Sequence, residues 1–522
     1  MIREISRRKC LRSWLCKPEY MERTKWENRF VLLRFRKKNY MMFLKDLKRF
    51  KMERLYDKLK AYSESDFYAF HMPGHKRNKA FLGIELPYDL DITEIDGFDD
   101  LHHADGILKE EQERAARVFG AEESHFLVNG STAGILSAVM GCTYRGDKIL
   151  VARHCHKSIY HAIYMNGLVP RYVYPEFDIS MHMNGEISKE DVAKALAAEP
   201  DIKAVVIVSP NYDGVVSDVK GIAEVAHSYG IPLIVDEAHG PHFGFHPVFP
   251  ERANDLGADV VINSLHKTLP SLTQTAILHI NGKIVNRRRI KKYLDMLQSS
   301  SPSYIFMASL DACVDFVDGK CENAFELYVE RLQKFREELK PLQHLQILRT
   351  EHYDISKVVI STANANITSP ELADRLRKEY HLEMEMTGGT YVLAMTTVAD
   401  TQEGLDRLKA ALLEIDGQLE AKTAVSGSIE ISGELPRLEQ YFTPQEAADR
   451  EEDGEAEEIP WKESEGHISL EYAYLYPPGS PVIVPGERIS REAVELLCYY
   501  ETQNLQIEGI QTEGKIKVWK HE

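Results

Sequence analysis

Two residues near the middle of the chain have side chains that could build a reactive centre. Lys267 lies in the run SLHK directly after the apolar stretch ADVVIN, and Asp236 ends the apolar stretch IPLIVD. In a dry cleft a lysine amine loses its proton more easily, because burial penalises the cation, and it then becomes a nucleophile. A carboxylate at the end of a buried stretch needs a partner, and a protonated ring nitrogen is one. Each signal alone is weak, since most lysines are solvated and an aspartate often caps a helix.

Three further positions offer groups that could hold a phosphorylated ring. NGST, residues 129–132, lies between a predicted strand and a predicted helix, where backbone N–H groups and two hydroxyls can cradle a phosphate. HCHKS, residues 154–158, follows the apolar stretch KILVA, and an imidazole there could stack on an aromatic ring. His239 follows Asp236 by three residues and could hydrogen-bond a ring hydroxyl. Serine and threonine are also ordinary helix caps, and a buried structural histidine would have the same pattern.

Together these positions supply a phosphate cradle, a stacking group, a partner for a pyridine nitrogen and a lysine. Pyridoxal phosphate (PLP) needs this set, because a carboxylate that keeps its ring cationic makes the ring an electron sink for a carbanion at Cα. Other cofactors fit worse. The chain has no GxGxxG after its first predicted strand and no GxxxxGK[ST], so dinucleotide and P-loop sites lack their fingerprints.

The same motifs fall at the ends of predicted strands within one α/β region, residues 109–280. Apolar runs alternate there with helical patterns, and the predicted strands are 124–130, 148–152, 170–174, 203–209, 231–237 and 258–264. This alternation predicts a mainly parallel sheet covered by helices on both faces. Ligands of such sheets bind beyond the C-terminal ends of the strands, so we expect the motifs to meet in one cleft.

A chain of 522 residues is too long for one ordinary core, so several domains are expected. Residues 52–340 are predicted to form the large domain, 341–416 a smaller α+β domain and 417–522 a C-terminal domain. The acidic run DREEDGEAEE, residues 449–458, is predicted to be a mobile surface loop, because it is charged and poor in apolar residues.

Residues 1–51 form a basic extension with 17 Lys/Arg against 5 Asp/Glu. Its net charge of +12 leaves −29 for the rest of a chain whose total is −17, and an acidic body disfavours nonspecific nucleic-acid binding. The extension could bind nucleic acid or an anionic membrane, but we favour an upstream start-codon error, because a normal helix pattern begins at Met52.

Composition argues against several other classes of protein. No apolar run approaches the ~20 residues that span a bilayer, and no signal peptide is evident, so a cytoplasmic location is expected. The seven cysteines include no CxxC pair, so neither a disulfide framework nor a structural metal site is expected.

With these motifs the chain resembles the fold-type I PLP enzymes, and specifically the ornithine/lysine/arginine decarboxylase family in its short Gram-positive form. The resemblance covers essentially residues 52–522. The segments that carry it are FHMPGHKRN (70–78), DDLHHADGILKEEQERAARVFGA (99–121), FLVNGSTAG (126–134), CHKSIYHA (155–162), SPNYDGVVSD (209–218), VDEAHGPHFGFHP (235–247), NSLHKTLPSLTQTA (263–276) and YPPGSPVIVPGE (476–487).

The resemblance implies a role for each matching residue. The catalytic positions match Lys267 as the Schiff-base lysine, Asp236 as the partner of the pyridine nitrogen and His156 as the ring-stacking histidine. The phosphate positions match Ser131, Thr132, Ser264 and His266, and His239 lies where the family contacts the ring hydroxyl. The resemblance also implies a homodimer or higher homo-oligomer with active sites at the subunit interface, where HMPGHK and the LTQ of SLTQTA could serve a neighbouring site.

The implied reaction is decarboxylation of a basic amino acid, with arginine as first choice and lysine or ornithine next. A cationic substrate requires an acidic partner in the cleft. Glu385 in LEMEMTGG is the candidate, and Glu94 and Asp96 are others. An aminotransferase or a carbon–sulfur lyase would use the same PLP groups, so both stay open. A PLP-binding regulator that places the basic extension on DNA is disfavoured, because the extension has no recognisable helix-turn-helix.

Overall fold

The computed structural model describes residues 54–81, 83–178, 183–348, 352–421, 434–475, 480–502 and 507–520. The basic extension, residues 1–51, lies outside the described residues, so its interpretation stays a prediction. Residues Leu55–Glu522 form one compact unit. Across the described ranges, no helix combines the length and the apolarity that crossing a membrane requires.

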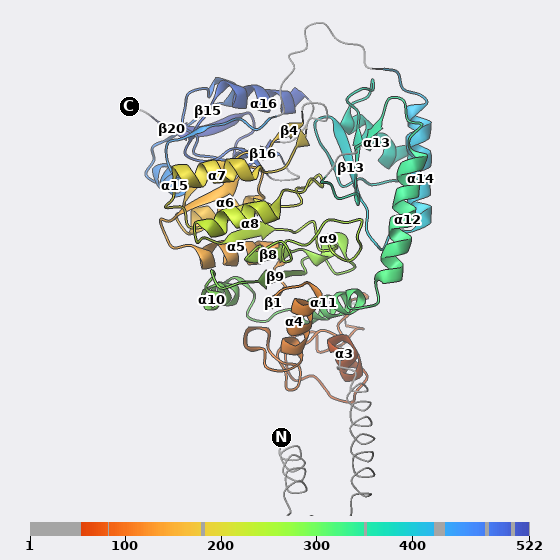
Figure 1. Ribbon diagram of the computed structural model, residues 1–522. Helices are drawn as coiled ribbons and strands as arrows, with labels where there is room; N and C mark the ends of the chain where they lie inside the picture. The colour runs from red at the N-terminus through yellow and green to blue at the C-terminus, as the bar shows by residue number, and fades with distance from the viewer. Residues whose placement is uncertain are drawn as a thin grey trace, which may run out of the picture. The chain divides into compact units, whose positions relative to one another are not determined.

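A seven-stranded sheet lies at the centre of this unit, in the order β1-β9-β8-β7-β6-β2-β3 (Figure 1). Its parallel members are β2 (Lys148–Ala152), β3 (Val169–Val173), β6 (Val205–Val208), β7 (Leu233–Asp236) and β8 (Val260–Asn263). The strand β9 (Ala276–Ile280) runs antiparallel to both of its neighbours, β8 and β1 (Glu123–Leu127). The predicted mainly parallel sheet is confirmed, with β9 as a reversed strand that the sequence pattern had not indicated.

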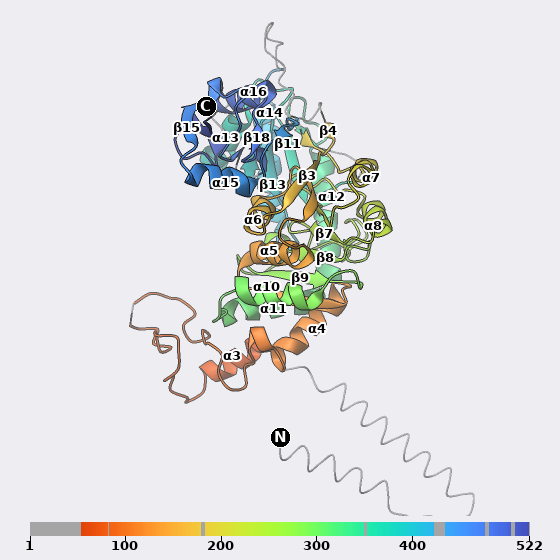
Figure 2. The ribbon, with the colours of Figure 1, turned by 90° about the vertical axis from the view of Figure 1, so that its left-hand side faces the viewer.

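Helices cover both faces of this sheet. The strands β6, β7 and β8 are rich in Val, Ile and Leu and buried at every residue, as expected for strands that pack on two sides. Figure 2 shows α5 (Gly130–Cys142) and α6 (Lys157–Met165) on one face, and α7 (Lys189–Ala198) and α8 (Val219–Ser228) on the other. Since every strand except β9 points the same way, the C-terminal ends of β1, β2, β7 and β8 meet at one edge.

A second, antiparallel sheet has the order β10-β11-β13-β12. Its strands are β10 (Gln346–Ile347), β11 (Lys357–Ser361), β12 (Met386–Thr387) and β13 (Tyr391–Met395). The chain reaches it through α10 (Arg287–Leu297), α11 (Tyr304–Val317) and α12 (Glu322–Glu338), and continues into α13 (Ser369–Tyr380) and α14 (Gln402–Asp416). A capping box of Thr368 and Glu371 fixes the start of α13, because it satisfies backbone N–H groups that the helix itself cannot pair.

The described residues of the C-terminal part form three small sheets, with strand orders β14-β18, β15-β20 and β17-β16-β19. Its elements are β14 (Glu439–Gln440), α15 (Pro444–Glu452), β15 (Ala456–Pro460), β16 (Ala473–Leu475), β17 (Pro481–Ile483), β18 (Glu487–Arg488), α16 (Arg491–Thr502), β19 (Ile507–Glu508) and β20 (Lys515–Trp519). A core of its own, which includes Trp461, Leu496 and Val518, lies between them.

The predicted mobile loop at residues 449–458 is wrong. The first part of this acidic run completes α15, which begins with a capping box of Thr443 and Glu446 and with Pro444 in its first turn. The second part enters β15, which pairs with β20 over its full length. Cap and strand pairing satisfy the backbone, and carboxylates of the run find partners, Glu451 in Lys517 and Glu455 in Trp519, so low hydrophobicity did not prevent order here.

Candidate active site

A cavity of about 630 Å³ opens at the C-terminal edge of the central sheet. The large domain provides most of its wall, Met395 comes from β13 of the second sheet, Glu385 directly precedes β12, and Ser480 comes from the C-terminal part. The predicted site residues in its lining are Ser131, Thr132, His156, Asp236, His239, His266, Lys267 and Glu385. A second cavity of the same volume, beside α4 (Ile107–Val118) and α10, contains none of them.

The predicted residues outside this lining are Ser264, Glu94 and Asp96. Ser264 is fully buried at the start of the short helix α9 (Leu265–Thr268), and its Oγ has no hydrogen-bond partner among the described residues. Neither Glu94 nor Asp96 lines the cavity within the described part of the chain. Of the three acidic candidates for substrate binding, Glu385 is therefore the one that lines this cavity.

Lys267 lies on α9, the helical turn that follows β8. Burial lowers the pKa of its amine, against the opposing attraction of Asp236 and Glu385. Its Nζ lies 2.8 Å from Nε2 of His239. The lysine is therefore held inside the cavity wall, in the desolvated setting that favours a nucleophilic amine.

Asp236 is the last residue of β7, with 3% of its surface exposed. Burial raises the pKa of its carboxyl, while Lys267 and the hydrogen bond from Ala238 N lower it. That bond reaches Oδ1 at 3.1 Å, and Oδ2 accepts no hydrogen bond from the described residues. A cationic N–H group in the cavity would meet both needs of this carboxylate, charge and a donor.

The N-terminus of α5 forms another part of the wall. Its N-cap residue, Asn129, makes no side-chain cap, so the first-turn N–H groups lack the usual internal partner. Ser131 and Thr132 add two hydroxyls to the same turn. The helix begins at Gly130, which has a φ of 73° and no other atom of the described residues within 4 Å of where a Cβ would lie. Such a helix start is a good anion site.

Histidines complete the wall. His156 is the N-cap of α6 and accepts a hydrogen bond from Ser158 N. Burial, followed by the charge of Lys267, lowers the pKa of His156 to about 4, so the ring is neutral at neutral pH. His266 uses Nδ1 to donate to Thr275 O at 2.9 Å, which leaves Nε2 for a ligand.

The structure adds residues that sequence reasoning missed. His154 lines the cavity together with His156, whereas the family resemblance of the HCHKS motif predicts a role for His156 alone. The rings of Tyr212 and His239 are tilted by 57° with centroids 4.5 Å apart, and the Tyr212 hydroxyl donates to Glu385. Lys357, the first residue of β11, is fully buried, and its Nζ lies 2.8 Å from Nδ1 of His239. Tyr212 lies in SPNYDG after a predicted strand, a usable signal, whereas Lys357 simply precedes an apolar run.

The donor set of this cavity fits PLP. Ser264 Oγ and His154 Nδ1 are buried without a hydrogen-bond partner in the described part of the chain. Buried polar atoms without partners are rare in proteins, and they mark places where a bound polar group completes the structure. His154 lines the cavity, and Ser264 lies just outside the lining, two residues before His266. With the uncapped start of α5 and Oδ2 of Asp236, these groups suit a phosphate and a protonated ring nitrogen.

Comparison with solved structures defines the class first. Lysine decarboxylase A from Pseudomonas aeruginosa superimposes with a TM-score of 0.77 at 22% identity, covering 96% of this chain and 84% of that one. The constitutive lysine decarboxylase of Escherichia coli gives a TM-score of 0.75 at 22% identity, covering 89% and 82%. Identity this low shows the fold, so the chain is an α/β protein of fold-type I, as predicted.

The family follows from the sequence matches. The chain belongs to the Orn/Lys/Arg decarboxylase family, whose major domain matches residues 53–422 and whose C-terminal domain matches residues 433–514. An arginine decarboxylase of Bacillus subtilis is 34% identical over 471 residues, covering 87% of this chain and 95% of the relative. That of Bacillus anthracis is 32% identical over 487 residues, covering 89% and 97%. The predicted family is confirmed, and the chain is an amino-acid decarboxylase.

Proposed function

We propose that this protein uses PLP to decarboxylate a basic amino acid, arginine first, to the corresponding amine and CO2. The observation that carries the proposal is one cavity in which a desolvated lysine amine, Lys267, lies with the buried carboxylate of Asp236. Relatives named arginine decarboxylase, 32–34% identical over most of the chain, favour arginine over lysine and ornithine.

The residues divide into those that would hold the cofactor and those that would meet the substrate. Lys267 would bind PLP covalently through Nζ, Asp236 would pair with its ring nitrogen and His156 would lie on its ring face. Its phosphate would meet Ser131, Thr132, Ser264 and His266, and its ring hydroxyl would meet His239. When bound, PLP supplies an electron-withdrawing ring that stabilises the charge left at Cα after the carboxylate departs.

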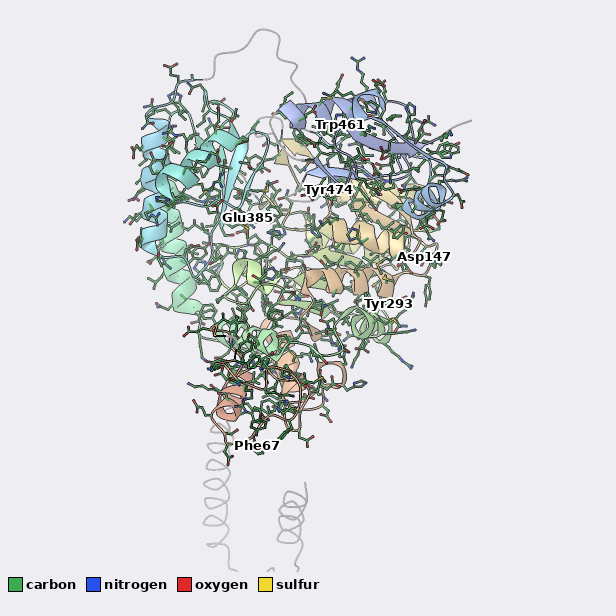
Figure 3. The ribbon with its side chains drawn as sticks, turned by 180° about the vertical axis from the view of Figure 1, so that it is seen from behind. Phe67, Asp147, Tyr293, Glu385, Trp461 and Tyr474 are labelled. Carbon is green, nitrogen blue, oxygen red and sulfur yellow. The ribbon has the colours of Figure 1, made fainter. Side chains whose placement is uncertain are left out.

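The side chains themselves supply charge and protons. Asp236, once paired with a cation, stays ionised, because an opposite charge at contact distance offsets the penalty of burial. Lys267 can return a proton to Cα, since a lysine amine desolvated in a cleft exchanges protons near neutral pH. Glu385 lies exposed at the cavity, beside the strands of the second sheet (Figure 3), where a guanidinium could bind its carboxylate through two hydrogen bonds.

The test is CO2 release from arginine, lysine and ornithine, each supplied alone to the PLP-loaded chain. We expect release from arginine and its loss in Lys267→Ala. Lys283→Ala is the matched control, because Lys283 is exposed and absent from the cavity lining, and it should release CO2 like the unchanged protein. Bound cofactor without CO2 from any of the three would overturn the proposal and point to transamination or carbon–sulfur cleavage.

We also propose that the working form is a homodimer or a larger homo-oligomer. Between α3 (Leu55–Ser63) and α4, Figure 2 shows a long segment that extends away from both helices. Its large exposed apolar side chains are Phe67, Tyr68, Phe70, Met72, Phe81, Ile84 and Leu86. Phe70 is 89% exposed, and Figure 3 shows Phe67 at the margin of the described residues. Exposed apolar clusters of this kind favour burial against another surface, here a second copy of the chain.

Residues of the LTQ motif bear on how such copies would share a site. Thr273 and Gln274 line the cavity of their own chain, and Leu272 beside them is 46% exposed. That these residues, like HMPGHK, contribute to the active site of a neighbouring chain stays a prediction.

A further inference from the structure

His239 lies between two lysine amines. Its Nε2 is 2.8 Å from Nζ of Lys267, and its Nδ1 is 2.8 Å from Nζ of Lys357. The two lysines come from different sheets, since Lys267 follows β8 of the central sheet and Lys357 begins β11 of the second. The three groups therefore form a continuous hydrogen-bonded row from the cavity wall into the fully buried interior.

Only some protonation states of the three groups allow both hydrogen bonds of this row. A neutral imidazole carries one N–H donor and one lone pair, whereas an ammonium group only donates. Burial, followed by the charges of Lys267 and Lys357, lowers the pKa of His239 well below its usual value, so the ring is neutral. Whichever nitrogen carries the hydrogen must donate to a neutral amine. At least one of the two lysines is therefore unprotonated while both contacts are made.

The surroundings favour Lys357 as the cationic member of the pair. The carboxyl of Asp354 is fully buried and held ionised, since the nearby His242 and Ser356 oppose the effect of burial and its pKa lies below the usual value. Burial lowers the pKa of Lys357 to about 8, close enough to neutrality for the amine to exchange its proton. Other charged or titratable groups act on each member of the row. Lys357 is influenced by Asp354, Asp213 and Glu385, and Lys267 by Asp236 and Glu385. His239 is influenced by His156 and His266.

We propose that Lys357 is a positioning residue that shares one proton with Lys267 through His239. In one arrangement the Lys357 ammonium donates to Nδ1, and Nε2–H donates to the neutral amine of Lys267. The second arrangement forms by transfer: one N–H bond of Lys357 breaks, and its proton bonds to Nδ1 of His239. At the same time the Nε2–H bond of His239 breaks, and that proton bonds to Nζ of Lys267. No proton is gained or lost in the exchange, and the ring ends as the opposite neutral tautomer.

This row of three side chains suits the chemistry proposed for Lys267, and the inference rests on that proposed function. The amine must be neutral to bond with a cofactor carbonyl, and it must hold a proton when it acts as an acid. A second amine behind His239 stores that proton without solvent. The position of the shared proton then sets the imidazole tautomer, because the hydrogen-bond partner of one ring nitrogen determines the state of the other.

The experiment measures how readily Lys267 reacts in the full chain without cofactor. Brief labelling with acetic anhydride over a series of pH values, read peptide by peptide by mass spectrometry, gives the pH midpoint of acetylation for each reachable lysine. Lys194, whose side chain is 77% exposed, is the internal reference and should keep one midpoint in every variant.

Lys357→Met and Lys357→Arg separate the possible roles of Lys357. Methionine keeps the length but removes the charge and the donor, so Lys267 should hold its own proton more tightly. We expect its midpoint to rise by about one pH unit, or about tenfold less acetylation near neutral pH. Arginine keeps a permanent donor to Nδ1 that cannot give up its proton, so the midpoint should equal or fall below that of the unchanged chain.

Equal Lys267 midpoints in the unchanged chain and the methionine variant would overturn the proposal, as would shifts of both variants in the same direction. If the arginine variant fails to fold, nitrogen NMR of His239 in the unchanged chain decides. The shared proton predicts a neutral ring with both nitrogens hydrogen-bonded near neutral pH, and a ring with one unpartnered nitrogen would exclude it. Because labelling needs neither cofactor nor substrate, its outcome is independent of the CO2 measurement.

Discussion

Arg153 and Glu487 form a doubly hydrogen-bonded ion pair with both side chains fully buried. The Nη1–Oε1 and Nη2–Oε2 distances are 2.7 and 2.8 Å. Arg153 follows β2 and precedes His154 and His156 of the cavity wall, whereas Glu487 begins β18 of the C-terminal part. The pair therefore ties the C-terminal part to the strand end that carries the predicted stacking histidine.

Replacing one partner of this pair should be costly. In Glu487→Gln the buried guanidinium loses its countercharge, and we expect the free energy of unfolding to fall by about 3–5 kcal/mol, measured by urea denaturation. Glu439→Gln is the control, because Glu439 is 71% exposed in its pair with Arg488 and should contribute under about 1 kcal/mol. Similar small losses in both variants would show that the buried pair does not stabilise the fold.

The carboxylate of Asp236 should matter for the reaction more than for cofactor retention. In Asp236→Asn the proposed ring nitrogen loses its anionic partner, and we expect CO2 release to fall about 10²–10³-fold. Visible absorbance should show that the cofactor is still bound through Lys267. Asp201→Asn, at a residue with a 59% exposed side chain, should leave the rate unchanged. A variant at Asp236 with near-normal release would exclude the proposed pairing.

Glu385 should determine how well a cationic substrate binds. A hydrogen bond to a charged group contributes about 1.5–3 kcal/mol, so Glu385→Gln should raise KM for arginine about 10- to 100-fold with a smaller change in kcat. Glu383→Gln is a close control, since Glu383 is exposed two residues away and does not line the cavity. Steady-state kinetics on both variants distinguish the two positions, and an unchanged KM in Glu385→Gln would remove it from substrate binding.

Buried histidines should make the fold sensitive to acid. Burial lowers the pKa of His279 to about 3 and those of His154 and His156 to about 4, from a usual value of 6.5. Below pH 6.5 the unfolded chain binds protons that the folded chain refuses, so stability should fall as the pH drops from 6.5 towards 4.

Urea unfolding at several pH values measures this acid slope. His279→Asn should flatten it, because asparagine can replace the Nδ1 contact with Ser124 but does not titrate. His103→Asn, at an 86% exposed side chain, should not. Parallel slopes in all three proteins would contradict the assignment to His279.

The exposed apolar segment between α3 and α4 should control assembly. The double variant Phe70→Asp, Phe81→Asp should shift the mass measured by light scattering from a dimer or larger species to a single chain, because charged side chains resist burial. Tyr229→Asp, at an exposed aromatic residue outside this segment, is the control. A single-chain mass for the unchanged protein would overturn the proposed homo-oligomer.

Much of the fold was predictable from local pattern. The run KILVA matches β2 residue for residue. The apolar runs predicted for β6, β7 and β8 agree with these strands to within two residues at each end. The agreement is close because strands buried on both faces are near-continuous apolar runs in the sequence. The prediction of a mobile loop at residues 449–458 was wrong, because composition carries no information about the cap at Thr443 or the pairing of this segment with β20.

The sequence by itself determined the family, the central sheet and the order of the motifs along its strand ends. Their meeting in one cavity follows from parallel strands that end at the same edge, which is a local rule applied several times. Only the tertiary structure brought Lys357 to His239, across 118 residues and between two sheets. No periodicity encodes that contact, because side chains from separate sheets meet only when those sheets pack, and packing decides which buried charges become partners.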